Sequence, residues 1–297
     1  MKVLLTGAGG QLGQQLVASV PERLAGEPLQ LLATGRSELD LADAEACRAA
    51  VATHRPDWIL NAGAYTAVDR AEQEPDLAQR VNGAAPRALA EAAAACGARM
   101  LQVSTDFVFN GRQGHPYQPD QPVAPLGVYG ASKASGEAGV LEALGPERAC
   151  VLRTSWVYGP VGRNFCLTML RLHRSKAEAG EPLGVVADHV GCPTSTLSLA
   201  EACWAVIGRG VGGIQQISDA GAASWYDFAV AIGELGVAAG LLERSARVRP
   251  ISTAEYPTPA ERPAYSLLAS AASYRRLQLE PVHWRERLRQ VLAQVQP

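Results

Sequence analysis

A tyrosine and a lysine four residues apart, Tyr129 and Lys133, form the pair with the clearest chemical potential in this sequence. The chain has only three lysines and eight tyrosines in 297 residues, so chance would give this spacing roughly 0.1 times per chain. On a helix, such residues share a face, with Cβ atoms about 6 Å apart. An ammonium about 4 Å from a phenol favours the phenolate by roughly 4 kcal/mol, which would lower the tyrosine pKa from about 10 towards about 7. We expect Tyr129 to exchange protons at neutral pH, and the alternative is an exposed pair on a helix surface.

A glycine-rich turn near the start of the chain predicts a dinucleotide site, because it follows an apolar run and precedes an amphipathic stretch. One possible register, GxGxxG from Gly7 and Gly9, has Leu12 where its third glycine belongs. The other, GxxGxxG, is complete at Gly7, Gly10 and Gly13 and is preferred. Glycines let the backbone approach a pyrophosphate, and the amides of a helix N-terminus favour its charge.

The position about 20 residues after this turn selects between NAD and NADP, because it meets the adenosine ribose. An acid there would bind the 2′-hydroxyl, whereas Arg36 suits a 2′-phosphate, so NADPH is favoured. NADH stays possible because Asp40 is close in sequence, and Arg36 could instead be an ordinary solvated charge. Further on, the small residues from Ala62 to Ala64 would let a nicotinamide ribose pass close to the backbone.

The elements that must position these residues alternate in type over the first half of the chain. The predicted strands contain residues 3–5, 31–34, 58–60, 100–103 and 151–153, and the predicted helices cover 11–20, 42–54 and 84–96. This alternation predicts an α/β fold, a Rossmann-like doubly wound parallel sheet, because parallel neighbours need crossover helices. We predict an NADP-binding Rossmann domain over 1–155 and a smaller α+β, mainly substrate-binding region over 156–297. The boundary is soft, since later segments can return to the sheet.

Composition limits the function classes. A hydrophobic content of 47%, a charged content of 19% and a net charge of −2 are typical of an ordinary soluble globular protein and give no basic excess for nucleic acid or a membrane surface. No signal-peptide pattern or membrane-spanning apolar stretch is present, so we expect a cytoplasmic protein. The six cysteines are scattered singly, and no metal site is expected from them.

Further motifs occur in both halves of the chain. They are Asp40-Leu41, Asn61-Ala62-Gly63-Ala64, the segments 66–69, 104–109, 153–158, 164–170 and 188–194, and Arg262-Pro263. Together with the glycine turn and the Tyr129/Lys133 pair, they resemble the extended short-chain dehydrogenases/reductases that act on nucleotide sugars. Within that superfamily the whole chain is similar to the dTDP-4-dehydrorhamnose reductase family.

The resemblance implies an NADP-dependent oxidoreductase acting on CH–OH. It would reduce the C4 ketone of dTDP-4-dehydro-6-deoxy-L-mannose to dTDP-L-rhamnose, the last step of dTDP-L-rhamnose biosynthesis, which supplies polymers such as the lipopolysaccharide O-antigen. Tyr129 would protonate the forming alkoxide, Lys133 would lower its pKa and bind the nicotinamide ribose, and Thr105 would orient the ketone oxygen. The implied cofactor-binding residues are Gly7, Gly10, Gln11, Leu12, Gly13, Arg36, Asp40, Leu41, Ala62, Gly63, Ala64, Tyr129 and Lys133. The implied substrate-binding residues are Thr105, Asp106, Phe107, Val108, Trp156, Asn164 and Arg262, with Arg262 near the diphosphate.

Two features bear on metals and assembly. Some family members form dimers through Mg²⁺ held by glutamates, one of them on the first helix, where this chain has Gln15. A neutral amide is a poor Mg²⁺ ligand, so the Mg²⁺-bridged dimer is disfavoured, and both a monomer and a homodimer stay open. Asp188 and His189 could form a metal or acid–base pair, but the glycine and proline that follow favour a structural loop.

Two alternatives stay open. The first is another nucleotide-sugar enzyme, an epimerase or a 4,6-dehydratase. A dehydratase needs paired carboxylates beside the Thr105 position, where only Asp106 is present, and Arg36 does not favour the NAD of an epimerase. The second is a non-catalytic NADP-binding regulatory subunit, of the kind known for methionine adenosyltransferase. The intact set of Thr105, Tyr129 and Lys133 argues against it.

Overall fold

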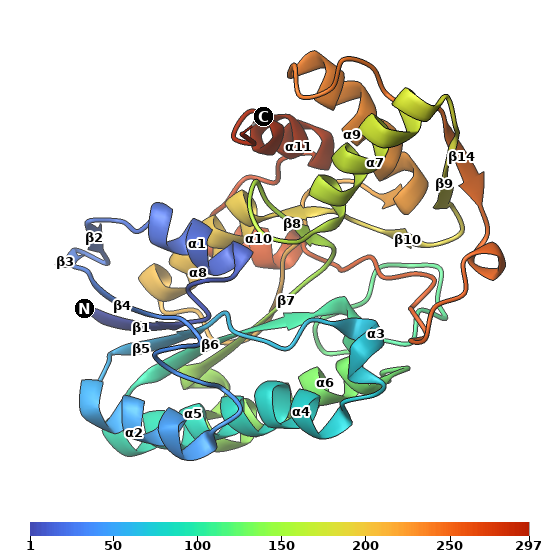
Figure 1. Cartoon of the computed structure of the whole chain (residues 1–297). Coiled ribbons are helices and arrows are strands. Elements are labelled where there is room, and N and C mark those ends of the chain that lie inside the picture. Colours follow the sequence, from blue (N-terminus) through green and yellow to red (C-terminus); the bar gives the residue numbers. More distant parts are fainter. Residues whose placement is uncertain (297) are drawn as a thin grey trace.

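A six-stranded parallel sheet runs through the middle of the protein (Figure 1). The computed structural model describes residues 1–296. The strands are β1 (Lys2–Thr6), β4 (Gln30–Thr34), β5 (Trp58–Asn61), β6 (Arg99–Thr105), β7 (Ala149–Thr154) and β12 (Gly213–Gln216). Their spatial order is β12-β7-β6-β5-β1-β4, and every pairing is parallel. The predicted α/β fold is confirmed, and the first five strands lie where the apolar runs placed them.

Helices cover both faces of the sheet, which explains why central strands such as β1 and β5 are mostly apolar. Below it in Figure 1 lie α2 (Ala44–His54), α5 (Ala85–Cys96) and α6 (Val128–Arg148), which share a core with alternate strand residues such as Leu4 and Ile59. On the other face lie α1 (Gln11–Ala18), α8 (Thr196–Arg209) and α10 (Ala271–Leu277), which pack on Leu5 and Leu60.

A smaller region lies at one end of this layered body, above it in Figure 1. Its core is formed mainly by α7 (Phe165–Ala179), α9 (Trp225–Ala238) and α11 (Trp284–Leu292). The short strand pairs are β8 (Val157–Tyr158) with β11 (Thr194–Ser195), β9 (Leu183–Val186) with β14 (Val248–Ile251), and β10 (Val190–Gly191) with β13 (Ala223–Ser224). The remaining elements are β2 (Arg23–Leu24), β3 (Glu27–Pro28), α3 (Val68–Ala71), α4 (Pro75–Gln79), a π-helical turn (Arg80–Ala84) and 3₁₀ turns at Asp106–Val108 and Thr253–Glu255.

The second half of the chain does return to the sheet. Strand β12 forms one edge beside β7, and α8 covers the same face as α1. Residues from α8 to β12 therefore belong structurally with the first half, as the soft boundary allowed. The predicted boundary at residue 155 itself stays a prediction.

Strand β1 lies between β4 and β5, so the chain leaves β1 towards one edge and later continues towards the other. In open α/β sheets, ligands bind outside the carboxyl ends of the strands at this reversal. Here the reversal brings the glycine turn after β1 beside the loop after β5. A Cβ atom added to Gly7 would lie 2.5 Å from the Cα of Gly63.

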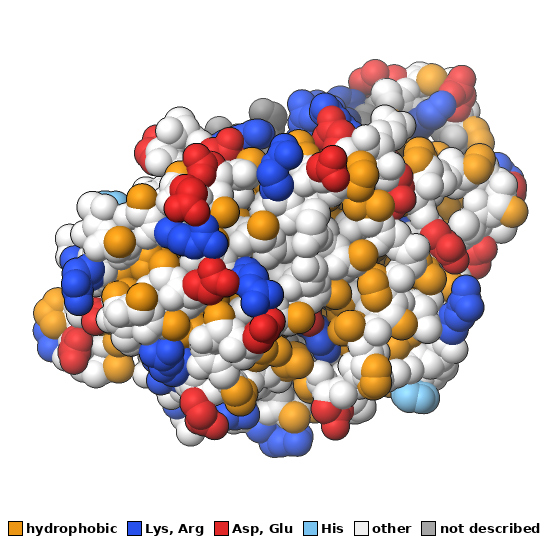
Figure 2. Space-filling view, turned by 90° about the horizontal axis from the view of Figure 1, so that it is seen from below, with side chains coloured by type: hydrophobic (Ala, Val, Ile, Leu, Met, Phe, Trp, Pro, Cys, Tyr) orange, Lys and Arg blue, Asp and Glu red, His pale blue; other side chains and the backbone are white. Residues whose placement is uncertain are grey.

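Figure 2 shows Lys and Arg interspersed with Asp and Glu over one face of the molecule. Within residues 1–296, no helix combines the length and the hydropathy that a membrane crossing needs.

Candidate active site

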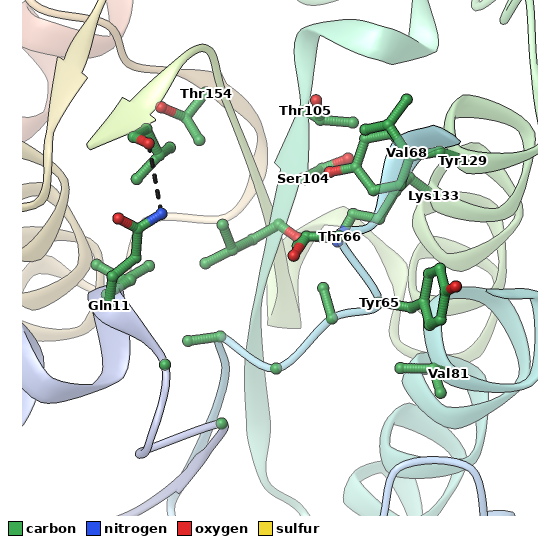
Figure 3. A pocket seen from close by; sticks show the side chains of 18 of the residues that line it. Gln11, Tyr65, Thr66, Val68, Val81, Ser104, Thr105, Tyr129, Lys133 and Thr154 are labelled. Carbon is green, nitrogen blue, oxygen red and sulfur yellow. Dashed lines mark hydrogen bonds between the residues drawn. The ribbon is translucent and has the colours of Figure 1, made fainter. Parts of the chain in front are cut away.

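A cavity of about 1010 Å³ lies at the carboxyl ends of β1, β5, β6 and β7. Most of the predicted site residues line it, from both halves of the chain. These are Gly7, Gly10, Gln11, Leu12, Arg36, Asp40, Leu41, Ala62, Gly63, Ala64, Thr105, Asp106, Phe107, Tyr129, Lys133, Trp156 and Arg262. In Figure 3, Thr105, Tyr129 and Lys133 lie together on one side, and Gln11 lies across the cavity from them.

The glycine turn has the geometry of the GxxGxxG register. Gly7 has a φ of +72°, and a Cβ on Gly13 would lie 2.1 Å from the Gly7 carbonyl oxygen. A Cβ on Gly9 would meet nothing within 4 Å. Helix α1 begins after Gly10 without a side-chain cap, so its first amides remain available to an anion. This close-packed turn, with its uncapped helix, fits the pyrophosphate of a dinucleotide.

The predicted selector of the 2′-phosphate lies in the loop after β4. Arg36 lines the cavity and forms no ion pair with any side chain of residues 1–296. Asp40 also lines the cavity, and its Oδ1 accepts a hydrogen bond from the Ala42 amide at 2.9 Å. The loop therefore offers an unpaired guanidinium, which suits a phosphate.

Tyr129 and Lys133 lie in the first turns of α6, so the helix that their spacing argument assumed is present. The first amide of this helix, at Val128, donates to Oε1 of Glu72 at 2.9 Å, so a carboxylate from a distant segment caps it. The Tyr129 ring meets Phe107 edge-on, with centroids 5.4 Å apart. Lys133 is buried, and its Nζ donates to the Val103 carbonyl at 2.7 Å.

The predicted lowering of the Tyr129 pKa by Lys133 is wrong for this structure. Burial raises the pKa of Tyr129 to about 12, and the charge of Asp106 adds to the rise, while the nearby Thr105 hydroxyl opposes it. Burial also lowers the pKa of Lys133 to about 8, against an opposing effect of Glu137. The spacing argument failed because it took no account of desolvation, which is the largest influence on the Tyr129 pKa, and Lys133 is not among the groups that shift that pKa.

Thr105 ends β6 and faces the cavity beside Tyr129. Its Oγ1 donates to Asp106 Oδ1 at 3.0 Å and accepts from the Phe107 amide at 3.2 Å. Asp106 is 1% exposed, its Oδ2 has no hydrogen-bond partner among the described residues, and burial raises its pKa to about 6. A hydroxyl and a carboxyl with a free oxygen thus stand beside the tyrosine.

Two buried polar groups fix α6 against the rest of the site. Glu137 forms an ion pair with Arg153 of β7, with Oε2 2.7 Å from Nη2. Asn82, in the π-helical turn, donates to the Tyr65 carbonyl and to Ser132 Oγ, so it joins the loop after β5 to the turn that carries Lys133. Sequence reasoning missed both contacts, because their partners lie far apart along the chain.

An aromatic wall lines one part of the cavity. Trp156 stacks on Trp225 with ring centroids 3.5 Å apart and an interplanar angle of 8°, and Phe165 lies 4.6 Å from Trp225. Trp156 has a φ of +47°, rare for a bulky residue, and a Cβ on Gly191 would lie 2.5 Å from its ring. Strain of this kind is typical of functional sites.

Arg262 enters the cavity from the second half of the chain. Its Nη2 lies 2.8 Å from Asp69 Oδ2, and its Nη1 donates to the Ala260 carbonyl at 3.0 Å. The Ala260 amide donates in turn to Asp69 Oδ1 at 3.2 Å. The arginine is therefore held across the cavity by a residue of α3, and it lowers the pKa of Asp69.

Three predicted site residues do not line the cavity. Gly13 packs behind the glycine turn, and Val108 is buried in a small core with Phe109 and Tyr117. Asn164 caps α7, accepting from the Leu167 amide at 3.0 Å. Their direct contacts with ligands remain predictions that this geometry does not favour.

Asp188 and His189 have the structural role that the sequence favoured. Asp188 accepts hydrogen bonds from the amide and the hydroxyl of Thr253, and Nε2 of His189 lies 2.9 Å from the same hydroxyl. Burial lowers the pKa of His189. Within residues 1–296, no group of three or more His, Cys, Asp or Glu side chains is arranged to hold a metal ion.

Several residues that the sequence did not single out as ligand contacts also line the cavity. The main ones are Tyr65, Thr66, Val68, Ser104, Thr154, Ser155, Arg163, Phe165 and Trp225. The capping box formed by Ser224 and Asp227 marks the start of α9, so the sequence holds a signal for a helix that begins at Trp225. The sequence holds no signal for the position of that helix in the folded protein.

Known proteins are similar to this chain over nearly its whole length. A family model described as the RmlD substrate binding domain matches residues 1–296. A dTDP-4-dehydrorhamnose reductase from Streptomyces griseus is 41% identical over 96% of this chain and 91% of its own length. A probable dTDP-4,6-dihydroxy-2-methyloxan-3-one 4-ketoreductase from Streptomyces antibioticus is 42% identical over 99% of this chain and 96% of its own.

Among solved structures, dTDP-4-dehydrorhamnose reductase from Bacillus anthracis in complex with NADP is similar over 98% of both chains, with 33% identity and a TM-score of 0.87. The agreement extends through both halves of the sequence and through the whole fold. The chain therefore belongs to the dTDP-4-dehydrorhamnose reductase family.

Proposed function

We propose that this protein catalyses the NADPH-dependent reduction of the C4 ketone of dTDP-4-dehydro-6-deoxy-L-mannose to dTDP-L-rhamnose. The single observation that carries this proposal is the meeting of Thr105, Tyr129 and Lys133 in the cavity that the glycine turn also lines. The named relatives support the same reaction, which completes dTDP-L-rhamnose biosynthesis. The cytoplasm as the place of reaction, and the supply of a particular rhamnose polymer, stay predictions.

NADPH, when bound, supplies the hydride that reduces the C4 carbonyl carbon. The turn between β1 and α1 would hold the pyrophosphate with its free amides, and Arg36 would hold the 2′-phosphate. Lys133 would bind the nicotinamide ribose. Its ammonium group would either give up its hydrogen bond to the Val103 carbonyl or keep that bond and donate a second one to the ribose. NADPH is preferred over NADH in this proposal because Arg36 has no competing carboxylate among the described residues.

At the reacting carbonyl, Thr105 and Tyr129 act as the two hydroxyl donors. The Thr105 hydroxyl would turn away from Asp106 and donate its hydrogen bond to the ketone oxygen, which would orient the ketone. The raised pKa keeps Tyr129 protonated at neutral pH, which is the form that a proton donor needs. As charge develops on the oxygen, Tyr129 protonates it, and the product hydroxyl forms.

The other walls of the cavity suit a sugar nucleotide. Asp106 would lie beside the sugar, and Phe107 and Trp156 offer flat apolar faces to the deoxysugar. Arg262 would bind the diphosphate, because a planar guanidinium makes two charge-assisted bonds to phosphate oxygens. Only one carboxylate stands beside Thr105, which disfavours the dehydratase reaction.

A coupled assay tests the proposal. Purified protein is supplied with dTDP-glucose, the preceding dehydratase and epimerase, and either NADPH or NADH. We expect loss of 340 nm absorbance with NADPH and the appearance of dTDP-L-rhamnose. NADPH binding without any turnover would favour the regulatory subunit. Turnover only with a 2-deoxy keto sugar, the class of substrate named for the Streptomyces antibioticus relative, would change the substrate and keep the chemistry.

A further inference from the structure

The loop between β8 and α7 lies across the N-terminus of α1. Gln11, the first residue of α1, donates from Nε2 to the Val157 carbonyl at 3.4 Å, a contact drawn in Figure 3. Asn164 donates from Nδ2 to Gln11 Oε1 at 3.2 Å and to the Gly159 carbonyl at 2.9 Å. A Cβ on Gly162 would lie 3.5 Å from Gln11 Cβ. A loop from the second half of the chain is thus fastened beside the helix start that faces the cofactor.

Arg163 is the charged residue of this loop. It is exposed, it lines the same cavity as Gly10 and Gln11, and it forms no ion pair with any side chain of residues 1–296. Arg262, which also lines the cavity, is already paired with Asp69. Arg163 therefore presents a guanidinium with no carboxylate to satisfy it.

The uncapped start of α1 lines the same cavity, next to the loop that carries this arginine. Its free amides and its helix dipole favour an anion, and the tight Gly7 turn brings backbone within reach of one. Amide donors on one side leave the other oxygens of a diphosphate open. A guanidinium fork is the side chain that fits two of them at once.

We propose that Arg163 binds the diphosphate of the dinucleotide cofactor, together with the amides of α1. This inference rests on the proposed cofactor site. With this contact, the bound cofactor would touch both halves of the chain. The role differs from that of Arg36, because NADPH and NADH share the diphosphate but only NADPH has the 2′-phosphate.

Direct binding measurements test the proposal on the full chain. Dissociation constants for NADPH and NADH are measured by calorimetry for the wild type, Arg163→Ala and Arg163→Lys. Loss of a charge-assisted contact weakens binding roughly 10- to 100-fold. We expect Arg163→Ala to weaken both cofactors by the same factor. Arg163→Lys keeps the charge but not the fork, so its loss should be smaller.

Arg171→Ala is the matched control, since Arg171 is an exposed arginine of α7 outside the cavity whose Nη2 reaches only Thr168. It should bind both cofactors as the wild type does. Unchanged NADPH binding in Arg163→Ala would overturn the inference. If Arg163→Ala raised only the Michaelis constant for the sugar nucleotide, Arg163 would instead bind the diphosphate of the substrate. If it weakened the binding of NADPH but not of NADH, Arg163 would instead bind the 2′-phosphate. Either result would overturn the inference. The proposed cofactor site fails separately, if the wild type binds neither cofactor.

Discussion

Burial decides the protonation of the residues at the reacting end of the cavity. Tyr129 has its pKa raised to about 12 and Lys133 has its pKa lowered to about 8, in both cases mainly by desolvation. A neutral phenol can donate a proton to the oxygen of a ketone that binds beside it. Burial also makes the charged form of Lys133 less favourable. The hydrogen bond from its Nζ to the Val103 carbonyl helps to hold the side chain in position.

Replacement of Tyr129 by Phe tests the proton donor. Tyr129→Phe should bind NADPH with nearly unchanged affinity, because only a hydroxyl is removed, while the turnover number falls by roughly 10²- to 10⁴-fold. Stopped-flow and steady-state assays at pH 7 give the turnover number, and fluorescence titration gives the binding constant. Wild-type turnover in this variant would show that another group donates the proton.

Arg36 is tested by the choice of cofactor. Arg36→Ala should raise the Michaelis constant for NADPH roughly tenfold or more, because a charge-assisted pair is lost, and should leave that for NADH nearly unchanged. Both constants come from the coupled assay with saturating sugar nucleotide. Equal losses with the two cofactors would remove Arg36 from the 2′-phosphate.

At the scale of elements, the site depends on how closely α1 and α6 approach the loops around them. Helix α1 packs on its own preceding turn, where no space remains for a Cβ on Gly13. Helix α6 is fixed to β7 through the buried pair of Glu137 and Arg153. These contacts set the distance between the pyrophosphate site and the tyrosine, which no single element controls.

Two alanine substitutions distinguish the possible glycine registers. Gly13→Ala should destabilise the protein by about 2 kcal/mol or more and weaken NADPH binding, because its Cβ would lie 2.1 Å from the Gly7 carbonyl oxygen. Gly9→Ala is the control and should change stability by less than about 0.5 kcal/mol, since its Cβ meets nothing within 4 Å. Denaturant unfolding measures both. Equal destabilisation by the two changes would contradict the GxxGxxG geometry.

At the scale of the whole molecule, a buried polar zone joins the sheet to the smaller region. Asp219, which follows β12 and is 2% exposed, accepts a hydrogen bond from the Ser195 amide at 3.0 Å. Its Oδ1 has no partner among the described residues, and burial raises its pKa to about 7. The folded protein therefore favours the protonated form of this carboxyl.

The contribution of Asp219 to stability should consequently fall as the pH rises. An unfolded aspartate has a pKa of about 3.9, so the unfolded chain releases this proton first, and the stability linked to Asp219 is present below about pH 4 and lost as the pH passes about 7. The loss is on the order of 4 kcal/mol. Asp219→Asn should reduce the decrease in melting temperature between pH 4.5 and pH 7.5.

Asp106, whose pKa is raised to about 6, remains in that variant, so part of the pH dependence should persist. Calorimetric melting at several pH values measures the slope for both proteins. An unchanged slope in Asp219→Asn would mean that Asp219 is ionised in the folded protein at acidic pH.

The sequence by itself determined the class of fold and the glycine register, and it singled out the side chains that we propose to react. Apolar period and turn residues are local properties, which is why five strands of the sheet and the helices over 11–20, 42–54 and 84–96 were predictable. Motifs with a shared mechanism extended this to a family and a reaction. Strand β12 was not predicted, because a short run such as Gly213–Gln216 becomes a strand only through pairing with β7.

Only the tertiary structure decided the properties that depend on neighbours far away in sequence. Desolvation reversed the expected direction of the Tyr129 pKa, and packing placed Val108 and Asn164 outside the cavity. Folding also brought Trp225 onto Trp156 and set the loop of Arg163 beside α1. Burial and long-range contacts are created by the assembled chain, so no local pattern of residues encodes them separately.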